Sequence, residues 1–171
     1  MKSVRLLRAA LLGAVALVVV SCADPTTPVP QPSGDLFGDL KQLTGLLQCT
    51  PLPYDSVTEI IGPEGGTIQV GPHTFTIPAG ALDTAVAITA VTPSDTVNQI
   101  QFQPEGLVFN GFTTVVMSYA NCNLLGSLLP LRIAYTSSDG AILDYLPSLD
   151  NGFTQTVRGK LQHFSEYAIA W

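Results

Sequence analysis

The stretch GPEGGTIQVGPHTFTI, residues 62–77, decides the fold of this 171-residue chain. In Thr67–Val70 and again in Thr74–Ile77, apolar side chains alternate one by one with polar ones. Successive side chains of a β-strand point to opposite faces of a sheet, so this period of two predicts strands with one buried face. Glycine and proline stand before and between the two runs, as they do in turns. The stretch therefore predicts two short strands separated by turns.

The same alternation continues along the chain. Its apolar positions are Ile100 and Phe102, then Val115, Met117 and Tyr119, then Leu131, Ile133 and Tyr135. Short strands with one apolar face and turn residues between them are typical of antiparallel sandwiches of about 100 residues. We therefore expect an all-β protein with an antiparallel β-sandwich over residues 56–171. Residues 122–131 break the alternation, and we expect a connection there with one helical turn.

The N-terminus has the three parts of a secretory signal peptide, which we predict over residues 1–21. A basic start precedes the apolar run Ala9–Val20, which is shorter than the about 20 residues that a spanning helix needs. The end of the signal, Val19-Val20-Ser21-Cys22, resembles the lipobox of bacterial lipoproteins. That resemblance implies acyl chains on Cys22. The alternative is ordinary signal cleavage that leaves a free Cys22.

A lipid on Cys22 would hold the protein on a membrane. The expected location is therefore the bacterial cell envelope, with the protein anchored through its lipid. Ala23 rather than aspartate follows the cysteine. By analogy with sorting in bacteria that have two membranes, this residue favours the outer membrane over the inner one.

Two segments are predicted between the lipid and the sandwich. Residues 22–34 contain four prolines and are predicted to form an extended linker, with a proline-rich ligand motif as the alternative. Residues 35–48 place leucine and phenylalanine three to four residues apart. This spacing predicts one short amphipathic helix that packs on the domain. The alternative is a helix that binds a partner or touches the membrane.

The chain is acidic, with thirteen Asp and Glu residues against seven Lys and Arg residues. Three of the basic residues lie in the predicted signal peptide, so its removal leaves a net charge near −9. A surface of this charge repels phosphate groups. Nucleic acid is therefore not expected as a partner, and attachment to a membrane must come from the lipid.

Cys49 and Cys122 remain once Cys22 is assigned to the lipid. In an oxidising compartment such a pair predicts a disulfide, which would close a loop of about 70 residues. Two free buried thiols are the alternative. No metal site is predicted, because the chain has only two histidines and no two cysteines stand at ligand spacing.

Signals of catalytic or cofactor chemistry are weak throughout the sequence. The glycines of residues 62–66 lack the lysine of a phosphate loop, and no serine stands in a nucleophile elbow. Asp139, Asp144 and Asp150 are interpreted as solvated or turn-forming acids, with a calcium site or a hydrolase carboxylate pair as weak alternatives. No cofactor is expected.

Glycan binding is an alternative function, because exposed aromatic rings can stack on sugars. The candidate rings are Tyr54, Phe112, Tyr145 and Phe153. Each of the four is as readily a core or turn residue.

Four short stretches of the sequence, taken in order, resemble the motifs of a known domain family. They are Gly65-Gly66-Thr67, Ile77-Pro78-Ala79-Gly80-Ala81-Leu82, Pro104-Glu105-Gly106-Leu107-Val108-Phe109, and His163-Phe164-Ser165 with Tyr167. In this order they resemble the ZU-five-type domain, a β-sandwich of zonula-occludens scaffolds, ankyrins and netrin receptors. The resemblance covers residues 62–171. One departure is Asn110-Gly111-Phe112, where relatives usually resume with Pro-Val.

In some members of that family, His-Phe-Ser is a self-cleavage site. The resemblance implies Ser165 as the nucleophile on the carbonyl carbon of Phe164 and His163 as the base that takes the hydroxyl proton. An unbroken final strand would instead make His163 and Ser165 neighbours on one face, with a structural role. No glycine or proline flanks the tripeptide to indicate the backbone strain that the reaction needs.

From these patterns we expect a non-enzymatic, lipid-anchored envelope protein. Its sandwich would serve structure or bind an unknown envelope protein or glycan. Self-cleavage between Phe164 and Ser165 is the first alternative, and a glycan-binding module is the second.

Overall fold

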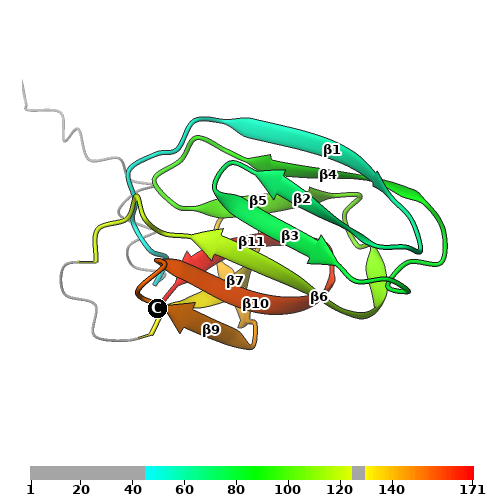
Figure 1. The fold of residues 1–171 in the computed structure, drawn as a ribbon. Coiled ribbons are helices and arrows are strands. Elements are labelled where there is room, and N and C mark those ends of the chain that lie inside the picture. The colour runs from blue at the N-terminus through cyan, green and yellow to red at the C-terminus, as the bar shows by residue number, and fades with distance from the viewer. Residues whose placement is uncertain (1–44, 125–129) are drawn as a thin grey trace, which may run out of the picture. The chain divides into compact units, whose positions relative to one another are not determined.

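The computed structural model describes residues 45–124 and 130–171 (Figure 1). The predicted signal peptide at 1–21, Cys22, the linker at 22–34 and residues 35–44 of the predicted helix lie outside the described residues. Half of the predicted connection at 122–131 lies outside them as well. None of the described residues belongs to a helix with the length and apolar character needed to cross a bilayer.

The described residues form eleven strands in two sheets (Figure 1). The strands are β1 (Asp55–Ile61), β2 (Gly66–Val70), β3 (His73–Ile77), β4 (Val86–Thr92), β5 (Gln99–Gln103), β6 (Val108–Ser118), β7 (Arg132–Thr136), β8 (Ile142–Tyr145), β9 (Ser148–Asn151), β10 (Thr156–His163) and β11 (Glu166–Ala170). One sheet has the order β1-β4-β5-β11-β7-β8 and the other β2-β3-β6-β10-β9, with antiparallel neighbours throughout. The predicted all-β antiparallel sandwich is confirmed for this part of the chain.

The apolar positions of the period-two pattern face the core between the sheets. All of those named above are buried except Tyr135, which is half-buried. Four phenylalanine rings from different parts of the chain meet within this core: Phe75, Phe102, Phe109 and Phe164. We call these four rings the phenylalanine cluster. Each such ring pair contributes about 0.5–1.5 kcal/mol beyond the area it buries.

The end of the predicted helix, Gly45–Gln48, is not helical. Leu46 forms a β-bridge with Ala170, and the N–H of Leu47 donates to the carbonyl oxygen of Ile169 at 2.9 Å. Leu46 and Leu47 are both buried, but in separate apolar clusters. An extended backbone points consecutive side chains to opposite sides, so it can bury both leucines where a helix would not. The prediction that the helix reaches Gln48 is therefore wrong.

The closing segment of the chain is not one unbroken strand. β10 ends at His163 in the five-stranded sheet, and β11 begins at Glu166 in the six-stranded sheet (Figure 1). Phe164 and Ser165 therefore carry the chain from one sheet to the other. The pairing of β10 with β6 shifts register between Leu161 and His163. This bulge and the burial of the Phe164 ring turn the chain without glycine or proline.

His73, at the start of β3, is fully buried. Its Nδ1 accepts a hydrogen bond from the N–H of Ser118 at 3.0 Å, so the proton of the neutral ring is on Nε2. Nε2 has no partner in the described part of the chain. Burial lowers the pKa of His73 to about 4. The folded protein therefore holds this ring uncharged at neutral pH.

Acid is expected to destabilise the fold through His73. The His73 ring takes up a proton near pH 6.5 in the unfolded chain but only near pH 4 in the folded chain. The free energy of unfolding is therefore highest above pH 6.5 and falls as the pH drops toward 4. The difference corresponds to about 3 kcal/mol. Urea unfolding of wild type and His73→Asn at pH 7 and pH 4 measures it, since asparagine keeps an acceptor for Ser118 but does not titrate. If wild type and His73→Asn lose the same free energy of unfolding between pH 7 and pH 4, His73 is not the cause of the acid sensitivity.

Candidate functional site

The four stretches that carry the ZU-five resemblance lie together in the fold. Backbone hydrogen bonds join residues in or beside them: Gly80 N–H to Pro63 O at 2.7 Å, Asn110 N–H to Ala81 O at 3.0 Å, and Gly106 N–H to Phe164 O at 3.1 Å. Gly65 has a φ of 75°, and a Cβ there would lie 2.4 Å from the carbonyl oxygen of Ile77. Only glycine permits this close approach of the first two stretches.

Phe164 pairs with all three other rings of the phenylalanine cluster. Its side chain is 1 % exposed and stacks on Phe102, with ring centroids 4.8 Å apart and an angle of 7° between the planes. Phe109 meets it edge-on at 5.0 Å. The backbone is held too, because Phe164 N–H donates to Leu107 O at 2.8 Å. The tripeptide is thus first a packing element at the crossing between the sheets.

The structure does not bring the candidate base onto the candidate nucleophile. The hydroxyl of Tyr167 donates to the carbonyl oxygen of His163 at 2.7 Å and lies 3.5 Å from Nδ1 of the same residue. The ring of Tyr135 also packs edge-on against the His163 ring, at 5.3 Å. No hydrogen bond joins His163 to the buried Ser165 hydroxyl within the described residues. Burial raises the pKa of Tyr167 well above its usual range, so its hydroxyl stays a donor.

Of the three candidate carboxylates, Asp139 lies in a turn as predicted, whereas Asp144 lies on β8 and Asp150 on β9, so the loop or turn placement is wrong for those two. Asp150 accepts hydrogen bonds from the Tyr119 hydroxyl at 2.7 Å and from the Leu131 N–H at 3.0 Å. Burial, with Asp150 beside it, raises the pKa of Tyr119 to about 12. The hydroxyl of Ser137 donates to Asp139 and lowers the pKa of that carboxyl group. No group of three metal-ligating side chains occurs in residues 45–124 and 130–171.

Cys49 and Cys122 form a disulfide. The predicted pairing is confirmed, and the alternative of two free thiols is wrong. The bond links the segment before β1 to the loop that follows β6. It also closes a loop with a sequence separation of 73 residues.

The outward face of the five-stranded sheet contains no Asp or Glu. Its residues alternate with buried ones along the strands. They are Thr67, Gln69, Thr74, Thr76, Val108, Asn110, Phe112, Thr114, Val116, Ser118, Leu149, Asn151, Thr156, Arg158, Lys160 and Gln162. We call this set the threonine face. It contains two of the three basic residues in the described part of the chain, which has ten acidic residues.

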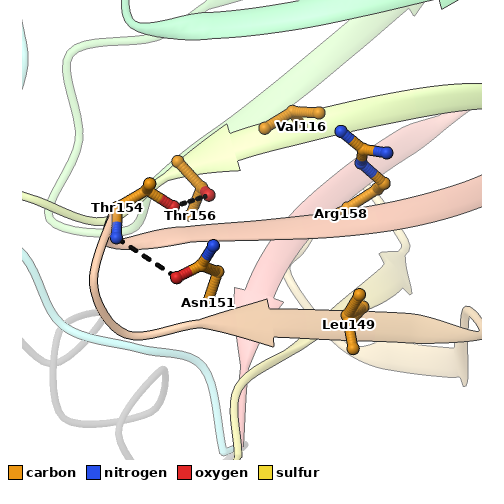
Figure 2. A pocket seen from close by; sticks show the side chains of 6 residues that line it. All are labelled: Val116, Leu149, Asn151, Thr154, Thr156 and Arg158. Carbon is orange, nitrogen blue, oxygen red and sulfur yellow. Dashed lines mark hydrogen bonds between the residues drawn. The ribbon is translucent and has the colours of Figure 1, made fainter.

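A hollow of about 470 Å³ opens on the threonine face (Figure 2). Its lining residues are Val116, Leu149, Asn151, Thr154, Thr156 and Arg158. Arg158 is the cross-strand neighbour of Val116 on one side and of Leu149 on the other, so these three residues form one side of the hollow. A second hollow, of about 420 Å³, shares Leu149 and Arg158 and adds Lys160.

The four aromatic residues that are candidates for glycan binding lie in different parts of the fold. Tyr54 is 64 % exposed before β1, and Phe153 is fully exposed in the turn after β9. Tyr145 is half-buried beneath the guanidinium group of Arg132, 4.2 Å from the ring centroid. Phe112 is exposed on the threonine face, with Lys160 Nζ 5.7 Å from its ring centroid. Only Phe112 therefore belongs to that face.

No protein-family model matches this chain, and no curated protein matches it. The ZU-five resemblance therefore rests on the quoted residues and stays a prediction.

Sequence reasoning missed the threonine face as a site. One signal was available, since Arg158 and Lys160 stand two residues apart in an alternating run of a chain with few basic residues. Their neighbours Val116 and Leu149 come from strands that only the sheet order places beside β10. That order is set by long-range pairing, which alternation alone does not specify.

Proposed function

We propose that this protein is a lipid-anchored component of a bacterial envelope, and that its sandwich is a non-enzymatic binding module that acts through the threonine face. The observation that supports it best is the charge of that face. A chain with thirteen acidic residues keeps these outward positions free of Asp and Glu and places Arg158 and Lys160 there. Neither cation has an ion-pair partner in the described part of the chain, so neither stabilises the fold through a salt bridge.

The location rests on other observations. The signal-like N-terminus ends at Cys22, which is the proposed site of the lipid. The disulfide between Cys49 and Cys122 supports export, because such bonds persist in oxidising compartments. Within the envelope, Ala23 favours the outer membrane. The partner is an envelope protein or a glycan, and the ZU-five resemblance supports a structural or binding role for the domain.

Intact mass of the protein purified from a bacterial host with two membranes tests the anchor. Wild type is expected to lack residues 1–21 and to carry the mass of two or three acyl chains, whereas Cys22→Ala should carry none. A wild-type mass without acyl chains would overturn the proposal that Cys22 carries a lipid. Binding is tested separately with Cys22→Ala, whose retention on isolated envelope fragments should fall when Arg158 and Lys160 are both changed to glutamine. Equal retention of both proteins would overturn the role of the face.

Self-cleavage is the second candidate, and two observations favour it. Phe164 and Ser165 lie where strand pairing is interrupted, and the N–H of Gly106 donates to the Phe164 carbonyl oxygen at 3.1 Å. Attack by the Ser165 hydroxyl on the Phe164 carbonyl carbon would develop negative charge on that oxygen, where this donor stabilises it. The missing hydrogen bond from His163 to Ser165 ranks this candidate below the first.

The same intact mass decides whether the chain is cut. Cleavage would place residues 165–171 on a separate peptide in wild type but not in Ser165→Ala. A single full-length species in both proteins would eliminate self-cleavage and leave the binding proposal unaffected.

A further inference from the structure

We propose that the threonine face binds an acidic polysaccharide, with Arg158 and Lys160 paired to carboxylate groups on its sugar units. This inference rests on the proposed function and names the class of ligand.

Arg158 has the geometry of an anion-binding residue. It lines one side of the hollow, between Val116 and Leu149 (Figure 2), and no hydrogen bond or ion pair occupies its guanidinium group within the described residues. A guanidinium group matches a carboxylate with two parallel hydrogen bonds. Because the neighbouring outward positions contain no acid, a carboxylate ligand has no competitor there.

Lys160 provides a second positive charge at a useful spacing. It lies two residues from Arg158 on the same side of β10, which places their Cα atoms about 7 Å apart. Its ammonium group is held near the ring of Phe112. A cation over an aromatic ring is attracted by the ring, and this orients Lys160. A polymer with repeated carboxylates can therefore meet both cations at once, while the Phe112 ring offers a surface for a sugar.

The hollow also presents donors for hydroxyl and carboxylate oxygens. Asn151 Oδ1 accepts from the backbone N–H groups of Phe153 and Thr154, at 3.1 and 3.3 Å. Its Nδ2 has no partner in the described part of the chain and remains a free donor. Among the described residues, the Thr156 hydroxyl is bonded only to that of Thr154, at 2.7 Å (Figure 2). Amides and hydroxyls beside the apolar side chains of Val116 and Leu149 suit the mixed polar and apolar surface of a sugar.

The alternative anionic ligands fit less well. Val116 and Arg158 are on β6 and β10, which lie inside the sheet, so their backbone groups are already paired and a peptide could add as a strand only at the sheet edges, β2 and β9. Nucleic acid and anionic membranes need many cations, and this face has two. A polymer of sugar units that each carry one carboxylate has negative charges for the two cations and hydroxyl groups for the polar side chains of the face.

Calorimetric titration of the full chain carrying Cys22→Ala tests the proposal. The probes are oligogalacturonate, neutral dextran and polyglutamate of similar length. Oligogalacturonate should bind, and the binding should weaken steeply as salt is added, whereas dextran and polyglutamate should bind at least tenfold more weakly. Arg158→Gln and Lys160→Gln should each raise the Kd for oligogalacturonate about tenfold, which is the loss of one charge-assisted contact.

Arg132→Gln is the matched control. It removes the same charge from the other sheet, where Arg132 covers Tyr145, and should change the Kd less than twofold. Absence of oligogalacturonate binding, equal binding of polyglutamate, or an equal effect of Arg132→Gln would each overturn the inference. If envelope retention still depends on Arg158 and Lys160 while oligogalacturonate fails, the proposed function stands and only the ligand class is wrong.

Discussion

Replacing Phe164 by alanine is expected to lower the free energy of unfolding by about 4 kcal/mol. The ring is 1 % exposed and touches Phe75, Phe102 and Phe109, so its removal leaves a cavity that three neighbouring rings cannot fill. The substitution also removes the buried side chain that holds the connection between β10 and β11 in place. Urea unfolding followed by far-UV circular dichroism measures the loss.

Phe153→Ala is the matched control for this prediction, because it deletes the same ring where the side chain is fully exposed. Its effect should stay within about 0.5 kcal/mol. Phe164→Leu keeps part of the buried volume and should fall between the two. A loss below about 1 kcal/mol in Phe164→Ala would mean that the tripeptide is not a core element.

Removing the disulfide is expected to destabilise the protein by about 4 kcal/mol in the chain-entropy model, given the 73-residue separation of the two cysteines. The double variant Cys49→Ala with Cys122→Ala avoids leaving one reactive thiol. Its midpoint in urea should drop well below that of oxidised wild type.

Reductant supplies the control for the disulfide. Dithiothreitol should move the wild-type midpoint toward that of the double variant and leave the variant unchanged. Amide exchange should also accelerate at Leu47, whose N–H bonds to Ile169 beside the bridge. If the oxidised and double-variant midpoints coincide, the bond does not contribute to stability.

The sandwich could be predicted from the sequence because alternation reports directly on burial. Ile68, Phe75 and Ile100 all face the core, and each stands between two polar residues in the chain. The disulfide could be predicted because only two cysteines remain after Cys22. Both inferences need local patterns or a count, and neither depends on the order of strands in a sheet.

The crossing at Phe164 and Ser165 could not be predicted in the same way. The pattern around them continues as if one strand ran through, and the break arises from the register shift near His163 and from distant aromatic rings. The helix predicted at Leu46 and Leu47 was wrong for a related reason. Consecutive leucines fit a helix as well as an extended segment that is covered on both sides. Long-range contacts decided both cases.

The position of the disulfide also has a mechanical consequence. If the chain is pulled at its two ends, tension that enters from the N-terminal side passes at Cys49 directly through the sulfur atoms to Cys122. The loop between them contains β1 to β6 and cannot be extended, which withholds about 250 Å of contour length from any stretching. Among the described residues, the segment before Cys49 and the part after Cys122, with β7 to β11, can unravel under such a load. A domain built this way extends by a short length when it is pulled, and reduction of the disulfide would increase that length.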